Sequence, residues 1–433
     1  MAKEDILIEE DLEITAATAG AAPVILPTRV ISIFPALAHR NFQLYFMGQA
    51  ISLIGFWLQQ VGTGYYVFQI THSAFWVGAS AAIGGLPFLI FTTFAGVAVD
   101  RVNKQKVLIL TQAAEAVVDI ALGILILTSR ANLPLVVIAM FLIGCINSID
   151  LPTRLTFLVE MVGKKDLASA IPINNGLFNA ARFVGPALAG ILIAFTSVGW
   201  TFILNGFSFI AGIWAILAIK PIYKYQAEVD VHPLESLKTG IKYSFTHPKI
   251  LYFIILAFFS AIFIWPFQTL MPVVSEKVFH TGAHGLGTLL SAAGAGSLTG
   301  AIFTSANSAR KNKIPLILIG IVISSVSLIL FSLNQNFTLA HVILFLAGFG
   351  TLMQVSTLNT LVQLNSPDNM RARVMAVYLT MFVGVMPLGN ILAGTLAQKT
   401  SALFTIGLSA ALMLLVGAAF YFKGIFKNLA ITN

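Results

Sequence analysis

The sequence predicts an all-α protein that crosses a membrane many times. Of its 433 residues, 58% are hydrophobic and only 10% are charged, whereas soluble domains carry about 25% charged residues. Mean hydropathy is +0.89, and a soluble chain of this length could not bury so much apolar surface. The single cysteine, Cys145, excludes an intrachain disulfide. We therefore expect a multi-pass membrane protein.

Apolar runs of spanning length follow one another along the chain. A transmembrane helix needs about 17–25 such residues, and we place twelve helices in two pseudo-symmetric six-helix bundles. The polar stretch between the sixth and seventh runs, with a helix near Leu234–Tyr243, divides them. The expected parts are a tail at 1–40, a bundle at 41–219, a linker at 220–249, a bundle at 250–423 and a tail at 424–433. The runs lie at roughly 42–69, 74–99, 107–128, 133–153, 167–195, 200–219, 250–275, 285–308, 314–333, 338–364, 370–397 and 401–422.

The distribution of Lys and Arg predicts the orientation. Of 25 such residues, 21 fall in the two tails and in the loops on the same side as the tails. The opposite side holds three, and Arg182 alone lies within a span. Because basic residues accumulate on the cytoplasmic side, both termini and the linker should be cytoplasmic. The net charge of +8 follows from this placement and is not a nucleic-acid footprint.

The two halves repeat one another at an offset of 204 residues. The segment GPALAG at 185–190 corresponds to GNILAG at 389–394, and Gly144 corresponds to Gly348. Gly96 and Gly300 each close an equivalent span shortly before a basic loop. Parallel six-helix repeats related by an axis along the membrane normal are typical of transporters whose site lies between the halves.

The loop after the second span carries a family motif. The segment GVAVDRVNKQK contains Gly96, Asp100, Arg101 and Lys104, and it resembles the signature Gly-x-Leu-Ala-Asp-Arg-x-Gly-Arg-Lys of the major facilitator superfamily. The resemblance implies a latch on the cytoplasmic side, in which Asp100 docks against Arg154 and the positive end of the helix that begins near Met370. Asp150 lies one turn from Arg154, so a local ion pair is the alternative.

Further segments resemble one branch of that superfamily over about residues 34–425. The segments FPALAHRNF, DLPTR, NAARFVGPALAG and LNGFSF are similar to bacterial siderophore exporters of the enterobactin type and to macrolide-efflux proteins. Gly185, Pro186 and Gly190 also match an antiporter motif. The resemblance implies proton-coupled export, by alternating access, of a siderophore-like or drug-like molecule across the bacterial inner membrane. Import, or flipping of a lipid or lysolipid, remains open.

Polar and aromatic residues on several spans predict a cavity. Gln49, Ser52, Phe56, Gln60 and Thr63 are spaced three or four apart and form a stripe on one helical face. Uncharged amides and aromatic rings suit a bulky amphipathic molecule, although polar contacts between helices are the alternative for any single residue. The predicted substrate-binding residues are Gln49, Phe56, Gln60, Asn147, Arg182, Trp265, Gln268 and Gln354, and Pro266 should bend its helix.

Glu115, Asp119 and Arg182 lie deep inside apolar spans. Glu115 and Asp119 share one face of the third span. Arg182 has two interpretations, because it either contacts an anionic group of the substrate or neutralises a carboxylate. The rise of 1.5 Å per residue puts Asp119 and Arg182 at similar depths, which predicts that they pair. Both acids are candidates for proton coupling, and Glu115 is the better one because it lacks an obvious partner.

Other function classes find little support in the residues. The segment around Gly294, Gly296 and Gly300 follows no strand and is better explained as a helix contact than as a dinucleotide site. His280 and His284 lack a third ligand for a metal. We expect no enzyme, cofactor or metal site, and a monomer whose partners are protons, membrane lipids and a small amphipathic substrate. A channel would lack the two-state latch.

Overall fold

The computed structural model describes residues 34–99, 102–220 and 233–426. Within them the chain forms helices and no strands, as predicted. A short 3-10 helix, η1 (Pro35–Ala38), precedes the first long helix. The first half contains α3 (Arg40–Thr71), α4 (Ala74–Val99), α5 (Lys104–Leu127), α6 (Leu133–Phe195) and α7 (Gly199–Ala218). The second half contains α8 (Pro233–Thr246), α9 (Pro248–Phe263), η2 (Trp265–Phe267), α10 (Met271–Lys277), α11 (Gly282–Ala306), α12 (Ile314–Leu333), α13 (Phe337–Leu364), α14 (Asp368–Phe382), α15 (Met386–Lys399) and α16 (Ala402–Phe422).

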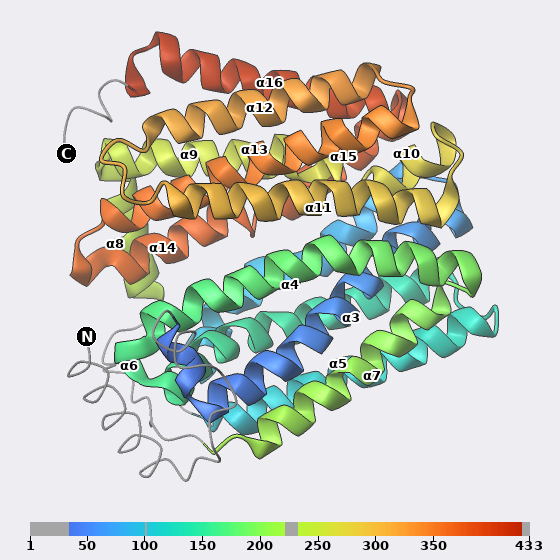
Figure 1. Cartoon of the computed structure of the whole chain (residues 1–433), viewed down its shortest axis with the longest axis horizontal. Coiled ribbons are helices and arrows are strands. Elements are labelled where there is room, and N and C mark those ends of the chain that lie inside the picture. The colour runs from blue at the N-terminus through green and yellow to red at the C-terminus, as the bar shows by residue number, and fades with distance from the viewer. Residues whose placement is uncertain (1–33, 100–101, 221–232, 427–433) are drawn as a thin grey trace, which may run out of the picture.

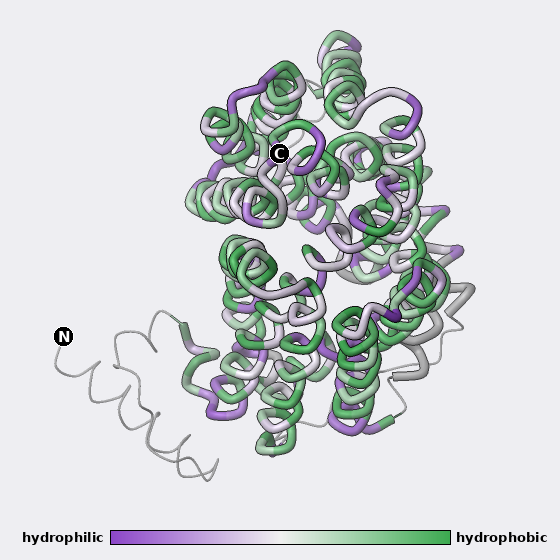
Figure 2. The backbone as a smooth tube through the Cα atoms, turned by 90° about the vertical axis from the view of Figure 1, so that its right-hand side faces the viewer, coloured by the Kyte–Doolittle hydropathy of each residue, from purple (hydrophilic) through white to green (hydrophobic). Residues whose placement is uncertain are grey.

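These helices provide the expected membrane spans. Eleven segments of the described chain are long and apolar enough to cross a membrane. The remaining predicted span is α3, whose 32 residues are also long enough, but whose amide stripe lowers its hydropathy. Hydrophobic residues follow the helices of both bundles (Figure 2). Many of them are exposed on the outer surface, as lipid-facing side chains are.

Two of the spans are interrupted, and two others meet at a kink. The segment α6 contains the fourth and fifth spans, two helices that meet at a kink at Gly163. Its φ of 71° is left-handed, a conformation that glycine adopts without steric cost. The seventh span breaks at η2, which contains Pro266, so the predicted bend is present. The eleventh span comprises α14 and α15.

The helices form two groups that meet along part of their length (Figure 1). One group contains α3–α7, and the other contains α9–α16. Equivalent glycines pack in equivalent ways within each group, because Gly144 contacts α4 at Gly84 and Gly348 contacts α11 at Ala293. Likewise Gly185 lies against Trp57, and the residue 204 positions later, Gly389, lies against Ala261. The internal repeat is therefore a repeat of packing.

Two pairs of glycines are among the close contacts between the groups. Gly190 of α6 meets Gly287 of α11, and a Cβ added at Gly287 would lie 2.8 Å from the Gly190 Cα. Gly78 of α4 meets Gly394 of α15, where an added Cβ would lie 2.9 Å from the Gly394 Cα. Both pairs lie in the halves of the spans that the charge distribution assigns to the outer side. The groups diverge toward the opposite end, where α3 begins and α16 ends (Figure 1).

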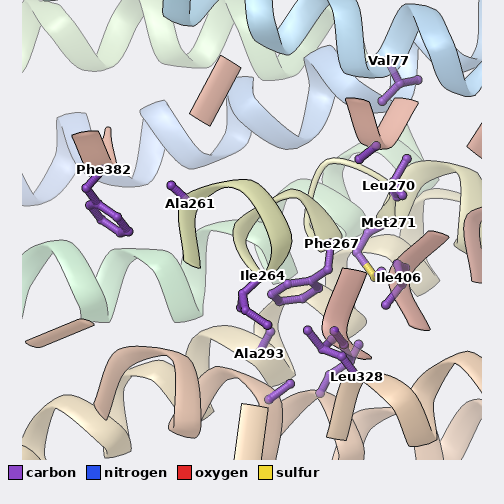
Figure 3. Packing of buried hydrophobic residues seen from close by; sticks show 14 of the residues in the cluster. Val77, Ala261, Ile264, Phe267, Leu270, Met271, Ala293, Leu328, Phe382 and Ile406 are labelled. Atoms are coloured by element: carbon purple, nitrogen blue, oxygen red, sulfur yellow. The ribbon is translucent and has the colours of Figure 1, made fainter. Parts of the chain in front are cut away.

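The buried core is continuous between the groups. One cluster of buried hydrophobic side chains includes Val77 of α4 together with Leu270 and Met271 near the break in the seventh span. Ile264 and Phe267 extend it toward Ala293 and Leu328 (Figure 3). The interrupted seventh span is thus held on several sides, which fixes the polar residues that it presents to the interior.

Candidate substrate cavity

A cavity of about 620 Å³ lies between the two groups of helices. Residues of α3, α4, α5 and α6 line it from one group, and residues from η2, α10, α11 and the eleventh span line it from the other. Its volume is within the range of about 300–1,000 Å³ that is typical of small-molecule sites. The predicted residues that line it are Gln49, Ser52, Phe56, Gln60, Thr63, Asn147, Arg182, Trp265 and Gln268.

The prediction for the tenth span was wrong. Gln354 is not among the residues that line the cavity; it is fully buried and packs against Gly320 of α12. Its amide atoms have no hydrogen-bond partner there. The spacing of Thr351, Gln354 and Leu358 identifies a shared helical face, but the face is directed at a neighbouring helix.

Arg182 enters the cavity from α6 and has no carboxylate partner among the described residues. Its side chain is 5% exposed, and its guanidinium carbon lies 4.8 Å from the ring centre of Trp265 and 5.7 Å from that of Trp57. Trp57 belongs to α3 and Trp265 to η2, so the cation lies between rings from both groups. Each cation–π contact contributes about 0.5–2 kcal/mol, which offsets part of the roughly 2.5–3.5 kcal/mol cost of an arginine at mid-membrane.

The predicted pairing of Asp119 with Arg182 is not formed. Asp119 is completely buried and accepts a hydrogen bond of 2.6 Å from Asn205 Nδ2, which ties α5 to α7. Its other oxygen, Oδ1, has no hydrogen-bond partner. Asp119 is directed at Asn205 of α7, whereas Arg182 lines the cavity.

Glu115 has a different environment from Asp119. Glu115 lines the cavity. Its side chain is 3% exposed, and its Oε1 accepts a hydrogen bond of 3.0 Å from Asn147 Nδ2. Of the two acids on this helical face, Glu115 is the one that a molecule in the cavity can approach.

A polar network lies beside Glu115 in the same group of helices. Arg154 donates hydrogen bonds to the Asp150 carboxylate and to the Gln49 side-chain oxygen. Thr111 donates to Asp150 with a distance of 2.7 Å. Arg154 is therefore engaged in the local ion pair, the alternative that the sequence left open. The latch partners Asp100 and Arg101 lie outside the described residues.

The other predicted latch residues have these positions. Lys104 Nζ lies 3.0 Å from Glu160 Oε1, an ion pair that joins the start of α5 to α6. Gly96 lies near the end of α4. Met370 is buried in the first turn of α14. These contacts fasten helices at the end of the molecule that carries the basic loops.

The antiporter-like motif forms part of the contact between the groups. Gly185 permits the close approach of Trp57, and the Pro186 carbonyl oxygen faces Gly287 of α11. Gly190 contacts Ala283 and Gly287. The motif therefore holds the tryptophan that stacks on Arg182 and closes one side of the cavity.

Hydrogen bonds reinforce the closure at the predicted outer end. The Gln398 side-chain oxygen, from the end of α15, accepts from Ser73 Oγ at 3.0 Å and from the Ala74 backbone N–H at 2.9 Å. Lys277 Nζ donates to the His72 carbonyl oxygen and lies 5.5 Å from the Phe68 ring centre. No charged motif marks Gln398, so sequence reasoning missed it.

Other lining residues were also missed. Trp57 follows Phe56 directly in the sequence. Because it is one position further along the helix, its side chain lies outside the predicted stripe and faces Arg182. Asn390 of α15 lines the cavity and accepts a hydrogen bond of 2.9 Å from Thr269. In the part of the chain that the structure describes, no group of three or more His, Cys, Asp or Glu residues could hold a metal ion. The site offers amides, aromatic rings, a cation and a buried acid for binding an organic molecule.

Comparison with known proteins places these features in context. A family model described as transmembrane secretion effector matches residues 31–429. The staphyloferrin A transporter of Staphylococcus aureus is 22% identical over 382 residues, which cover 87% of this chain and 95% of that protein. The enterobactin exporter EntS of Citrobacter koseri is 24% identical over 387 residues, which cover 88% of this chain and 90% of that protein.

Solved structures share the fold. The nucleoside transporter NupG aligns with a TM-score of 0.70 and 12% identity, over 91% of this chain and 100% of that chain. A bacterial homologue of the iron transporter ferroportin, in an inward-facing state, aligns with a TM-score of 0.68 and 15% identity, over 90% and 99% of the two chains. Both are membrane transporters, so the likeness places this chain among transporter folds.

Proposed function

We propose that this chain, which belongs to the transmembrane secretion effector family of the major facilitator superfamily, exports a bulky amphipathic organic molecule in exchange for protons. It is a multi-pass transporter of a bacterial cytoplasmic membrane. The observation that carries the proposal is the cavity of about 620 Å³ between the two bundles, lined by aromatic rings and amides. The names of the relatives support a siderophore-like substrate.

The arrangement of the contacts supports alternating access. The bundles touch through Gly190 with Gly287 and Gly78 with Gly394, both in the predicted outer halves of their spans. The cavity between them is bounded on that side by these pairs and by the Gln398 hydrogen bonds. We infer that this arrangement is the state that loads substrate from the cytoplasm, and that opening of the outer contacts releases it.

Glu115 is the proposed proton carrier. An ionised carboxylate inside a membrane is costly, and such residues are typical of proton relays. Glu115 lines the cavity beside the network of Asp150, Arg154 and Gln49. The residue that donates a hydrogen bond to it, Asn147, belongs to α6. Protonation of Glu115 would change the charge of the surface that contacts substrate. Binding of the proton is thereby coupled to binding of the substrate. Asp119, bonded to Asn205 outside the cavity, has a structural role.

Transport in everted vesicles tests the proposal. Vesicles from cells that produce the protein receive staphyloferrin A or enterobactin under an imposed pH gradient, acidic inside. We expect accumulation of at least one of them, and we expect a protonophore to abolish it. Vesicles that lack the protein supply the baseline. Accumulation that is the same with and without the pH gradient would contradict proton coupling. Absence of accumulation of both compounds would contradict a siderophore-like substrate.

A further inference from the structure

Arg182 is a cation whose charge the surrounding protein leaves unneutralised. It is 5% exposed, and it has no ion-pair or hydrogen-bond partner among the described residues. The contacts with Trp57 and Trp265 involve its charge and the ring faces, and they leave its N–H donors unused. A buried guanidinium ordinarily has a carboxylate or phosphate partner.

The acids near the cavity already have partners. Asp150 receives hydrogen bonds from Arg154 and Thr111, and Glu115 receives one from Asn147. Asp119 is bonded to Asn205 and does not line the cavity. None of these acids forms an ion pair with Arg182, and its position on the cavity wall lets a molecule in the cavity supply that partner.

The position of Arg182 also restricts the rest of that molecule. The guanidinium carbon lies within 5.7 Å of ring centres from both bundles. Phe56, Gln60 and Gln268 line the same cavity and offer ring faces and amides. A small inorganic anion would leave most of this surface without contacts, whereas an aromatic or similarly flat organic anion would cover it.

We propose that Arg182 binds an anionic group, of the carboxylate type, on an organic substrate, and that Trp57 and Trp265 hold the attached apolar body. This inference rests on the proposed transport function and specifies its substrate class. Because Trp265 belongs to the second bundle and Arg182 to the first, an anion bound there contacts both halves. The charge of the substrate is thus recognised at the interface between the two bundles, which has to rearrange during transport.

Three small probes separate charge from ring contacts. 1-Naphthaleneacetate carries both a carboxylate and a ring system, 1-naphthaleneacetamide carries only the rings, and acetate carries only the charge. Binding to the purified full chain in nanodiscs is measured by calorimetry, with empty nanodiscs subtracted. We expect naphthaleneacetate to bind at least about tenfold more tightly than either of the others, since charge-assisted hydrogen bonds discriminate at this level.

Variants identify the residue that is responsible. R182Q should abolish the preference for the acid over the amide, and R182K should retain part of it. R130Q, which removes a positive charge from an exposed position away from the cavity, should leave the preference unchanged. Melting temperatures of all three variants establish that they are folded.

Several results would overturn the inference. These are equal affinity for acid and amide in the wild type, absence of saturable binding of the acid, or an unchanged preference in R182Q. Acetate binding as tightly as naphthaleneacetate would refute the role of the rings. None of these results bears on the vesicle assay with siderophores, so failure of this inference is distinguishable from failure of the export proposal.

Discussion

At the scale of single residues, two acids one turn apart have different surroundings. Glu115 and Asp119 share a helical face, yet Glu115 reaches the cavity and Asp119 reaches Asn205 on α7. A helical face spans enough arc to touch two neighbours, so spacing alone does not assign a common role. The two acids differ in the amide that donates to them, which is Asn147 of α6 for Glu115 and Asn205 of α7 for Asp119.

Replacement of Glu115 by Gln tests its role as the proton carrier. In proteoliposomes, E115Q should reduce gradient-driven substrate accumulation to below about a tenth of wild type, because the neutral amide cannot exchange a proton. Exchange of substrate across the membrane without a gradient should persist, since the cavity keeps its shape. The measurement is paired: accumulation and exchange of the same labelled siderophore.

D119N is the matched control for E115Q. It makes the same chemical change one turn away, outside the cavity, and should leave the response to the gradient intact. If D119N lost gradient-driven accumulation while E115Q kept it, the assignment of the two acids would have to be reversed.

Residue depth could be predicted from the sequence, whereas residue direction could not. The rise along a helix gives one coordinate, and it predicts similar depths for Asp119 and Arg182. Their pairing also requires that both side chains point toward each other, which depends on how α5 and α6 are rotated in the bundle. The same limit explains Gln354, which lies on a polar face that is directed at Gly320.

At the scale of elements, the spans follow from hydropathy and the breaks follow from special residues. The predicted run at 314–333 coincides with α12, and the runs at 133–153 and 167–195 fall within α6. That these two spans meet at a kink at Gly163, with no longer loop between them, could not be predicted because basic residues there resemble an ordinary loop. Pro266, by contrast, identified its break directly.

Substitution of Gly287 tests the contact between α11 and α6. A Cβ at this position would lie 2.5 Å from the Pro186 carbonyl oxygen and 2.8 Å from the Gly190 Cα. Backbone atoms cannot move aside, and overpacking of this kind costs about 1–3 kcal/mol. G287A should therefore shift the population toward a form that is open at the predicted outer end.

Spin labels measure this opening. Cysteines replacing Arg130 and Gln335, in a C145S background, place one label on each bundle, and G287A should lengthen the distance between them. G176A is the control, because an added Cβ at Gly176 has no neighbour within 4 Å. Identical distance distributions for G287A and G176A would show that this contact does not set the closure.

At the scale of the whole molecule, the distribution of charge predicts the orientation. The two tails and the loops on their side carry 21 of the 25 Lys and Arg residues, which predicts that this side is cytoplasmic. A fluorescent protein fused after Asn433 should therefore fluoresce. Alkaline phosphatase inserted at Gln335, on the opposite side, should be active. If a phosphatase fused at the C-terminus were active, the predicted orientation would be wrong. The proposed direction of transport would then have to be reversed.

Proton movement on addition of substrate tests the central claim most directly. Everted vesicles that contain the protein are acidified inside, and a pH-sensitive dye reports the internal proton concentration when staphyloferrin A or enterobactin is added outside. The account predicts a release of protons that is saturable in substrate, present in D119N and absent in E115Q. Substrate uptake with no proton release, or with equal release in E115Q, would contradict it.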